Sequence, residues 1–304
     1  MTTSIYFSTE RIQVVQGKFN KGKLLIQGVF TESLPEGTMI NGVIANESAI
    51  YRALERLVDV ANLQKQPVDL IVDSGSILTK RLCVPILSQK KLLELVKGEF
   101  VDVKENYENL IYDYSVISRK NPQGAGGVIL CAAMESNFSF SYIEVFKKMN
   151  LKLKSIDIAI SAEIGLAHFI PEFRERTFIL AVLESNNIVS SLFVNGQYYF
   201  TNRTRLLAPR GTEESTAEIS QAISSLMQFN QSQKTGAEIS DIYFCGLNTD
   251  ESELTVELSN IYNIAIAPLA AYSVIEVDPT VKYRMADNLY VTGNLLIKDG
   301  SYHG

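Results

Sequence analysis

The chain has 304 residues, of which 46% are apolar and 20% are charged, and this size and composition indicate a folded protein of two domains and exclude a disordered one. The formal net charge of -6 argues against nucleic acid as a partner, because a protein that binds nucleic acid needs a basic surface. No apolar run reaches the ~20 residues that a membrane span needs and no signal sequence opens the chain, so we expect a cytoplasmic protein.

The first 78 residues predict one domain that begins with three strands. Strand patterns on both sides of a glycine-containing turn at residues 20–23 indicate a meander over residues 4–32. Apolar residues spaced by three and four then predict an amphipathic helix over residues 48–63, and residues 68–72 read as a fully apolar strand. The order β-β-β-α-β is typical of a sheet with a crossover helix on one face.

The segment from residue 79 to residue 160 has a different order of elements. Its pattern predicts strands at 81–86, 109–118, 128–134 and 152–160, and helices that begin after Ser88 and at residue 138. We interpret this β-α-β-β-α-β segment as an inserted small α+β subdomain of about 80 residues, which lies within the usual size range of an independent unit. Residues 161–175 are expected to return to the first domain as a helix.

Residues 176–304 repeat the theme of the first domain. An apolar run and an alternating run lead to Asn195-Gly196, which is a strong hairpin signal because both residues accept the positive φ angles of a tight turn. The pattern then predicts a long helix at 214–231, a strand at 239–245, a helix at 254–262 and a short strand at 264–268. The last helix, within residues 286–298, is expected to return to the first domain.

Two β-β-β-α-β halves with an inserted subdomain predict a two-domain α/β protein with the actin-like fold of sugar kinases and actin. Three segments also carry a family resemblance: INGVIANESAIYRAL, LCVPILSQKKLLELVKGEFVDVKENYENLIYDYSVI and TAEISQAISSLMQFNQSQKTGAEISDIYFCG. Over almost its whole length the chain resembles the type IV pilus assembly protein PilM family, relatives of the bacterial cell-division protein FtsA.

The resemblance implies a scaffold of pilus assembly and leaves self-association open. Its partner would be the short cytoplasmic N-terminal tail of a single-span inner-membrane protein, PilN or its equivalent, which would hold the scaffold at the inner face of the cell membrane. A short tail is well held as an extended peptide in an apolar groove. We place this groove where the subdomain meets the first domain, with the alternative that the same side chains form the subdomain's own core. Its expected lining is Leu82, Val84, Leu92, Leu95, Phe100 and Tyr107.

Two turns that hold phosphates in the actin-like fold are altered in this sequence. In related chains the first turn reads Asp-Ile-Gly followed by Ser or Thr, and the Asp orients magnesium. Here the residues are YFST, so Tyr6 stands at the Asp position and Ser8 at the Gly position. In the second turn Leu183 stands at the Asp position. Glu184 comes one residue later, on the opposite face of the strand, and is expected to reach the site only if the strand is bulged.

A third nucleotide element, a glycine pair after the strand at 239–245, keeps only Gly246, because Leu247 occupies the second position. With both aspartates absent we expect a protein that has lost nucleotide chemistry, with no cofactor and no catalytic residue. The alternative is an actin-like ATPase of the FtsA type that binds Mg-ATP and polymerises. For that case the resemblance assigns nucleotide binding to Ser8, Thr9, Gln13, Glu184, Ser185, Asn186 and Gly246.

Other candidate groups carry weaker signals. Glu163 would suit an acid that positions water, but we favour a charge on an exposed turn of the returning helix. His168 and His303 have no second ligand at metal spacing, so we expect no metal site. The cysteines are odd in number and lie far apart in apolar runs, which indicates buried free thiols at Cys83, Cys131 and Cys245.

Overall fold

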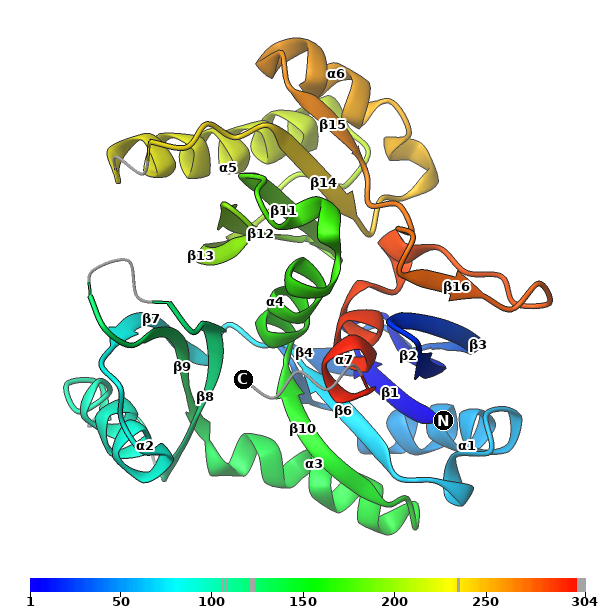
Figure 1. Ribbon diagram of the computed structural model, residues 1–304. Helices are drawn as coiled ribbons and strands as arrows, with labels where there is room; N and C mark the ends of the chain where they lie inside the picture. Colours follow the sequence, from blue (N-terminus) through cyan, green and yellow to red (C-terminus); the bar gives the residue numbers. More distant parts are fainter. Residues whose placement is uncertain (105–106, 108, 121–123, 234–235, 300–304) are drawn as a thin grey trace.

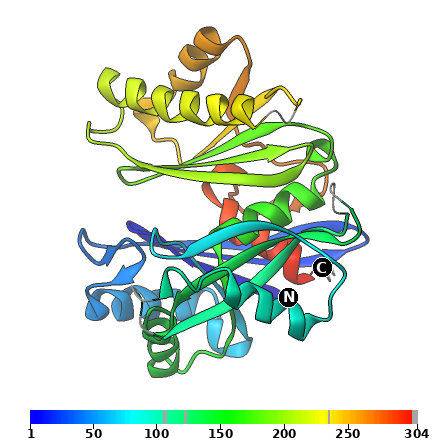
Figure 2. The same ribbon diagram turned by 90° about the vertical axis from the view of Figure 1, so that its left-hand side faces the viewer.

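The computed structural model describes residues 1–104, 107, 109–120, 124–233 and 236–299. Two large sheets lie one above the other, with helices α4 (Ala159–Phe169) and α7 (Leu289–Asp299) between them (Figure 1 and Figure 2). The minor elements are β4 (Met39–Ile40), β5 (Val43–Ile44) and short 3-10 helices at Leu63–Lys65, Pro171–Phe173, Thr249–Glu251 and Met285–Asp287. Within the described ranges, no helix is long and apolar enough to cross a membrane.

The sheet of the first domain has six strands in the order β10-β6-β1-β2-β3-β16. The strands are β1 (Thr2–Phe7), β2 (Arg11–Asn20), β3 (Lys23–Ser33), β6 (Val68–Val72), β10 (Leu153–Ile158) and β16 (Ile275–Val277). The first three form the predicted antiparallel meander, and β6 and β10 add in parallel beside β1. Helix α1 (Glu47–Val60) buries Ile50, Leu54 and Leu57, the apolar stripe that the spacing predicted.

The sheet of the second domain repeats the order of the first. Its strands run β13-β12-β11-β14-β15, which corresponds to β3-β2-β1-β6-β10. They are β11 (Phe178–Glu184), β12 (Asn187–Val194), β13 (Gln197–Arg205), β14 (Asp241–Cys245) and β15 (Ala265–Pro268), with helices α5 (Glu213–Ser232) and α6 (Leu254–Tyr262). Asn195 and Gly196 have φ angles of 50° and 72°, so the predicted hairpin turn is present. The duplicated order confirms the predicted actin-like α/β fold.

Two glycines let the helices between the sheets pack closely. Gly293 of α7 lies against the carbonyl oxygen of Ala162 in α4, and a Cβ at Gly293 would collide with that oxygen. Gly165 of α4 faces the side chain of Ile297 in the same way. Leu295 of α7 belongs to the core of the first domain. Gly293 is therefore a packing site between the two helices.

The insert is a three-stranded antiparallel sheet with the order β7-β9-β8. It contains β7 (Leu78–Val84), α2 (Gln89–Gly98), β8 (Leu110–Ser118) and β9 (Gly127–Glu135). Alternate residues of β9 face opposite sides, as in any strand. Ile129 and Cys131 pack with α2 in a small core of the insert, whereas Val128 and Leu130 pack against the first domain.

The predicted boundary of the insert at residue 160 is wrong. Strand β10 pairs in parallel with β6, so that Ile156 lies opposite Leu70 in the sheet of the first domain. Helix α3 (Ser136–Lys148) also belongs there, because Tyr142 and Phe146 pack against Phe7 of β1 with ring centroids 5.6 and 6.0 Å apart. The β-α-β-β-α-β pattern predicted the elements but not the sheet or core that each one joins. The insert therefore ends with β9.

Candidate functional site

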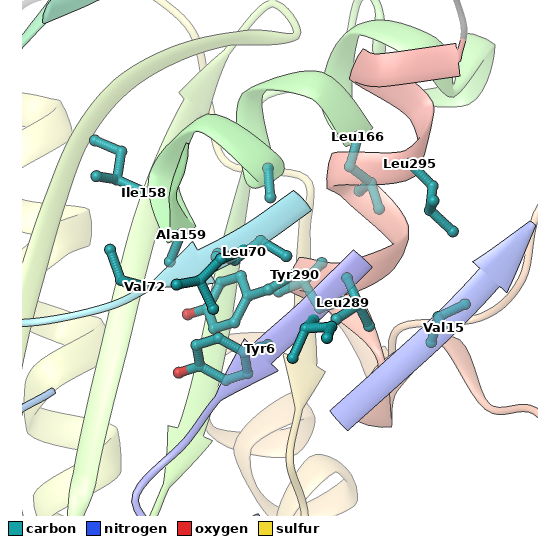
Figure 3. Packing of buried hydrophobic residues seen from close by; sticks show 14 of the residues in the cluster. Tyr6, Val15, Leu70, Val72, Ile158, Ala159, Leu166, Leu289, Tyr290 and Leu295 are labelled. Atoms are coloured by element: carbon teal, nitrogen blue, oxygen red, sulfur yellow. The ribbon is translucent and has the colours of Figure 1, made fainter. Parts of the chain in front are cut away.

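The turns after β1 and β11 meet between the two domains through direct hydrogen bonds. The Tyr6 hydroxyl donates to Glu184 Oε2 at 2.6 Å, and the Thr9 backbone N–H donates to Glu184 Oε1 at 2.9 Å. Tyr6 also packs edge-on against Tyr290 of α7, with ring centroids 5.0 Å apart, and Figure 3 shows the two rings side by side. Side chains of the protein itself therefore join the two phosphate-turn positions.

Burial disfavours the charged forms of both Tyr6 and Glu184. It raises the pKa of Tyr6 well above its ordinary value, and the negative charge of Glu184 raises it further. Burial also raises the pKa of Glu184, while the hydrogen bonds from Tyr6 and Thr9 oppose that shift. Tyr6 consequently remains a protonated donor across the whole physiological pH range, and the bond to Glu184 persists.

Leu183 does not occupy the cleft position that the sequence alignment assigned to it. Its side chain is buried in the core of the second domain, beside Ile188 and Phe244. Glu184 is the last residue of β11 and reaches the cleft without any register shift between β11 and β12. The expected requirement for a bulge is thus wrong, because the strand ends at Glu184 and Ser185 turns with a φ of 49°.

The other predicted nucleotide residues are occupied by protein contacts or are divided between two cavities. Ser8 Oγ accepts from the backbone N–H groups of Glu10 and Arg11, and Gln13 Nε2 donates to the Asp287 carbonyl at 2.6 Å. A cavity of about 80 Å³ borders Ser8, Gln13, Glu184, Ser185 and Gly246. A second cavity, of about 520 Å³, borders Thr9, Glu184, Ser185 and Asn186. The first is far smaller than the roughly 300 Å³ at which small-molecule sites begin.

Arg210 is a residue of this region that the sequence patterns did not reveal. It forms a buried ion pair with Glu251 and donates from Nη2 to the Gly246 carbonyl at 2.9 Å. Glu251 in turn accepts from the Asn248 backbone N–H at 2.8 Å. The retained glycine, whose φ is 73°, therefore passes close to an arginine. A lone arginine in the turn before α5 gave no signal of this contact in the sequence.

Glu163 is buried, which overturns the expectation of an exposed charge. It is 0% exposed on α4, and its Oε2 accepts from the Ser191 hydroxyl at 2.5 Å. Its Oε1 has no hydrogen-bond partner among the described residues. Burial raises its pKa to about 8, so the carboxyl group is mostly protonated at neutral pH. Glu163 lines a cavity of about 370 Å³ that also borders Asp73 and Arg203. These two residues form an ion pair between the domains, in which Arg203 Nη2 donates to both carboxylate oxygens of Asp73 at 2.6 Å.

A second type of site lies between the insert and the first domain. A cavity of about 300 Å³ is bordered by β8 and β9 on one side and by α3, β10 and the start of α4 on the other (Figure 1). Ile111 of β8 and Ile143 of α3 line it and remain 44% and 38% exposed. Leu130, Ala132 and Met134 of β9 supply further apolar surface. We call this cavity the insert groove.

The side chains predicted to line a peptide groove do not line this one. Val84 and Phe100 are buried in the core of the insert, and Leu82, Leu92 and Leu95 pack against that core on the α2 side of the sheet. Tyr107 is half-buried in a turn after α2. The alternative interpretation of these apolar residues, as the core of the insert, agrees with their packing, and the insert groove lies on the opposite face.

Neither the histidines nor the cysteines form a metal site in the part of the chain that the structure describes, where no group of three or more His, Cys, Asp and Glu is placed to hold an ion. His303 lies outside the described residues. All three cysteines are free, but only Cys131 and Cys245 are buried. The predicted burial of Cys83 is wrong, because it lies on β7 with partial exposure.

The duplicated sheets and the helix pair between them define the class of actin-like proteins. The chain belongs to the type IV pilus assembly protein PilM family, since the family model matches residues 4–219. No curated protein matches the chain significantly.

Solved structures support the same fold at low sequence identity. A PilM-PilN type IV pilus biogenesis complex matches with a TM-score of 0.78 and 14% identity, over 97% of this chain and 96% of that one. A protein of Bacteroides thetaiotaomicron with an actin-like ATPase fold matches with a TM-score of 0.53 and 14% identity, over 88% and 90%. The cytoplasmic domain of EpsL from the type II secretion system of Vibrio cholerae matches with a TM-score of 0.50 and 10% identity, over 97% of both chains.

Proposed function

We propose that this protein is a scaffold of type IV pilus assembly that binds the short cytoplasmic N-terminal tail of a single-span PilN-like membrane protein in the insert groove. The family and the similarity to a PilM-PilN complex support the class of partner. Binding the tail would hold the scaffold at the inner face of the membrane.

The observation that carries the proposal is the exposed apolar surface of the insert groove. Ile111 and Ile143 face this cavity from separate elements and keep more than a third of their surface in contact with solvent. An apolar cavity with exposed aliphatic walls favours an apolar occupant, because burial of such surface contributes roughly 25 cal/mol per Å². A cavity of about 300 Å³ accommodates a few side chains of an extended peptide.

Recruitment to a membrane tests this proposal directly. Liposomes that carry the full-length PilN-like partner are expected to bring the protein into the floating fraction of a density gradient. Liposomes that carry the same partner without its N-terminal tail are expected to leave the protein in the soluble fraction. Equal recruitment by both kinds of liposome would reject the tail as the attachment point.

We also propose that this scaffold works without nucleotide. The Tyr6 hydroxyl and the Thr9 N–H bind Glu184 in the position where a phosphate group would need donors. A neutral tyrosine at the Asp position supplies no magnesium ligand, and magnesium is needed to neutralise the charge that develops in phosphoryl transfer. The cavity of about 80 Å³ that borders Gly246 is too small for an adenine nucleotide, and the cavity of about 520 Å³ does not border Ser8, Gln13 or Gly246.

Calorimetry with magnesium-ATP is expected to show no binding heat at ligand concentrations up to about 1 mM. The melting temperature is expected to stay unchanged under the same conditions, because a ligand far below its dissociation constant adds almost no stability. An actin-like protein of known nucleotide affinity serves as the positive control. A micromolar dissociation constant would instead favour the alternative, an ATP-binding protein of the FtsA type.

A further inference from the structure

We infer that the insert groove selects a tail that pairs as a strand with the free edge of β8 and places a cationic side chain opposite Asp113. This inference rests on the proposed function and names the chemistry of the tail. Three features of the described residues support it: a strand edge with no paired strand that borders the groove, the alternation of side chains along that edge, and one acidic group with no cation paired to it.

Strand β8 offers an edge for strand addition. Among the described strands it pairs only with β9, so its other side carries backbone N–H and C=O groups without a neighbouring strand. Tyr112 and Tyr114 border the groove although their side chains pack in the core of the insert, which indicates that the backbone of β8 forms this part of the wall. Strand addition gives affinity through main-chain hydrogen bonds and specificity through alternate side chains.

Strand β10, the edge on the other side of the groove, is a poorer template. It has six residues, and its register with β6 shifts between Leu153 and Ser155. A bulge twists an edge and interrupts regular pairing. The nine residues of β8 shift register only between Val116 and Ser118, beyond the part that lines the groove. We therefore assign the tail to β8.

The groove side of β8 has a defined pattern. Ile111, Asp113 and Ser115 are two residues apart, so they share one face of the strand, and all three line the groove. The Ser115 hydroxyl lies 3.1 Å from the hydroxyl of Ser161 in α4, which closes this end of the groove. The five residues from 111 to 115 span about 13 Å, which sets a tail footprint of about five residues.

Asp113 supplies the charge selectivity. It is exposed, and no cation pairs with it among the described residues. Among the described residues, its Oδ1 accepts from the backbone N–H of Tyr114, at 2.8 Å. Asp157 on the opposite wall is already balanced by Lys298, with 3.0 Å between Oδ2 and Nζ. The groove thus keeps one negative charge that a lysine or arginine of the tail would neutralise, two positions from an apolar residue that packs on Ile111.

A set of three synthetic peptides tests this selectivity. Each has eight residues that alternate leucine and threonine, with leucine at the first, third and seventh positions, and only the fifth position differs, where it carries lysine, glutamine or glutamate. Fluorescence anisotropy is expected to show that the lysine peptide binds about two- to fivefold more tightly than the glutamine peptide, the range typical of an exposed ion pair. The glutamate peptide is expected to bind most weakly, and added salt is expected to narrow the differences.

Variants of the protein locate the effect. Asp113→Asn is expected to make the lysine and glutamine peptides equal, and Asp113→Lys to make the glutamate peptide the tightest. Asp102→Asn removes the same charge from an exposed turn of the insert outside the groove and is expected to keep the original order. N-methylation of the peptide amides that face β8 is expected to weaken binding at least tenfold.

Several outcomes would overturn the inference. Equal affinities of the three peptides for the unmodified protein would reject charge selection by Asp113, and full-strength binding of the N-methylated peptide would reject strand pairing. Absence of binding by all three peptides would also reject it. The liposome experiment decides the proposed function separately, because recruitment by the tail remains measurable when these peptides fail.

Discussion

Ile143→Arg is expected to abolish binding of the tail peptide while the protein stays folded. Ile143 lies on α3, is 38% exposed and forms one wall of the insert groove. Arginine is longer and charged, so it would fill the groove and remove the apolar surface on which the tail packs. The affinity for a fluorescein-labelled peptide of the partner's N-terminal tail is expected to fall at least fiftyfold in an anisotropy titration.

Phe140→Arg is the matched control for this substitution. Phe140 lies on the same helix and is 56% exposed, but it does not line the groove. Both variants exchange a partly exposed apolar residue for arginine, so we expect both melting temperatures to stay within a few degrees of the unmodified protein. Only Ile143→Arg should lose the tail. Tail affinities that are unchanged in both variants would place the binding site elsewhere.

Glu163→Gln is expected to remove the contribution of Glu163 to the pH dependence of the free energy of unfolding. The pKa of Glu163 is about 8 in the folded protein and 4.5 ordinarily, because burial disfavours the charged form. The folded state therefore keeps a proton that the unfolded state loses between these pH values. The contribution of this bound proton to the free energy of unfolding is complete below pH 4.5 and is lost as the pH rises through 8.

Glutamine imitates the protonated carboxyl group at every pH and still accepts a hydrogen bond from Ser191. Between pH 5 and pH 8, the free energy of unfolding of Glu163→Gln is expected to gain on the order of 4 kcal/mol relative to the unmodified protein. Urea denaturation at both pH values measures this gain. Glu144→Gln, at an exposed position of α3, should show no such gain. Parallel pH profiles for all three proteins would contradict the burial of Glu163 as a neutral acid.

Local signals in the sequence were sufficient for most of the elements but not for their partners. Asn195-Gly196 predicted its hairpin because the positive φ angles are a property of those two residues. Strand β10 was recognised as a strand but assigned to the insert, because its pairing with β6 depends on residues about 85 positions earlier in the chain. Local sequence predicts that a segment is a strand, whereas the strand it pairs with depends on the tertiary structure.

The candidate sites were harder to predict for the same reason. Apolar residues build both a core and a groove, so Leu82 and Ile111 look alike in the sequence and only the face of the insert sheet separates them. Glu163 was expected on the surface because glutamate is rarely buried, and nothing near it in sequence indicated the hydroxyl of Ser191. Leu183 and Glu184 differ by one position, and the end of β11 decides which of them faces the cleft.

The bond between Tyr6 and Glu184 joins two groups of one polypeptide, so their effective concentration is set by the fold. A nucleotide that bridges two domains holds them by mass action, and its hold weakens when its free concentration falls. The strength of an intramolecular hydrogen bond does not depend on the concentration of any free ligand. Under the proposed nucleotide-free function, a scaffold whose domains are joined in this way would keep the same arrangement in a growing cell and in a starving one.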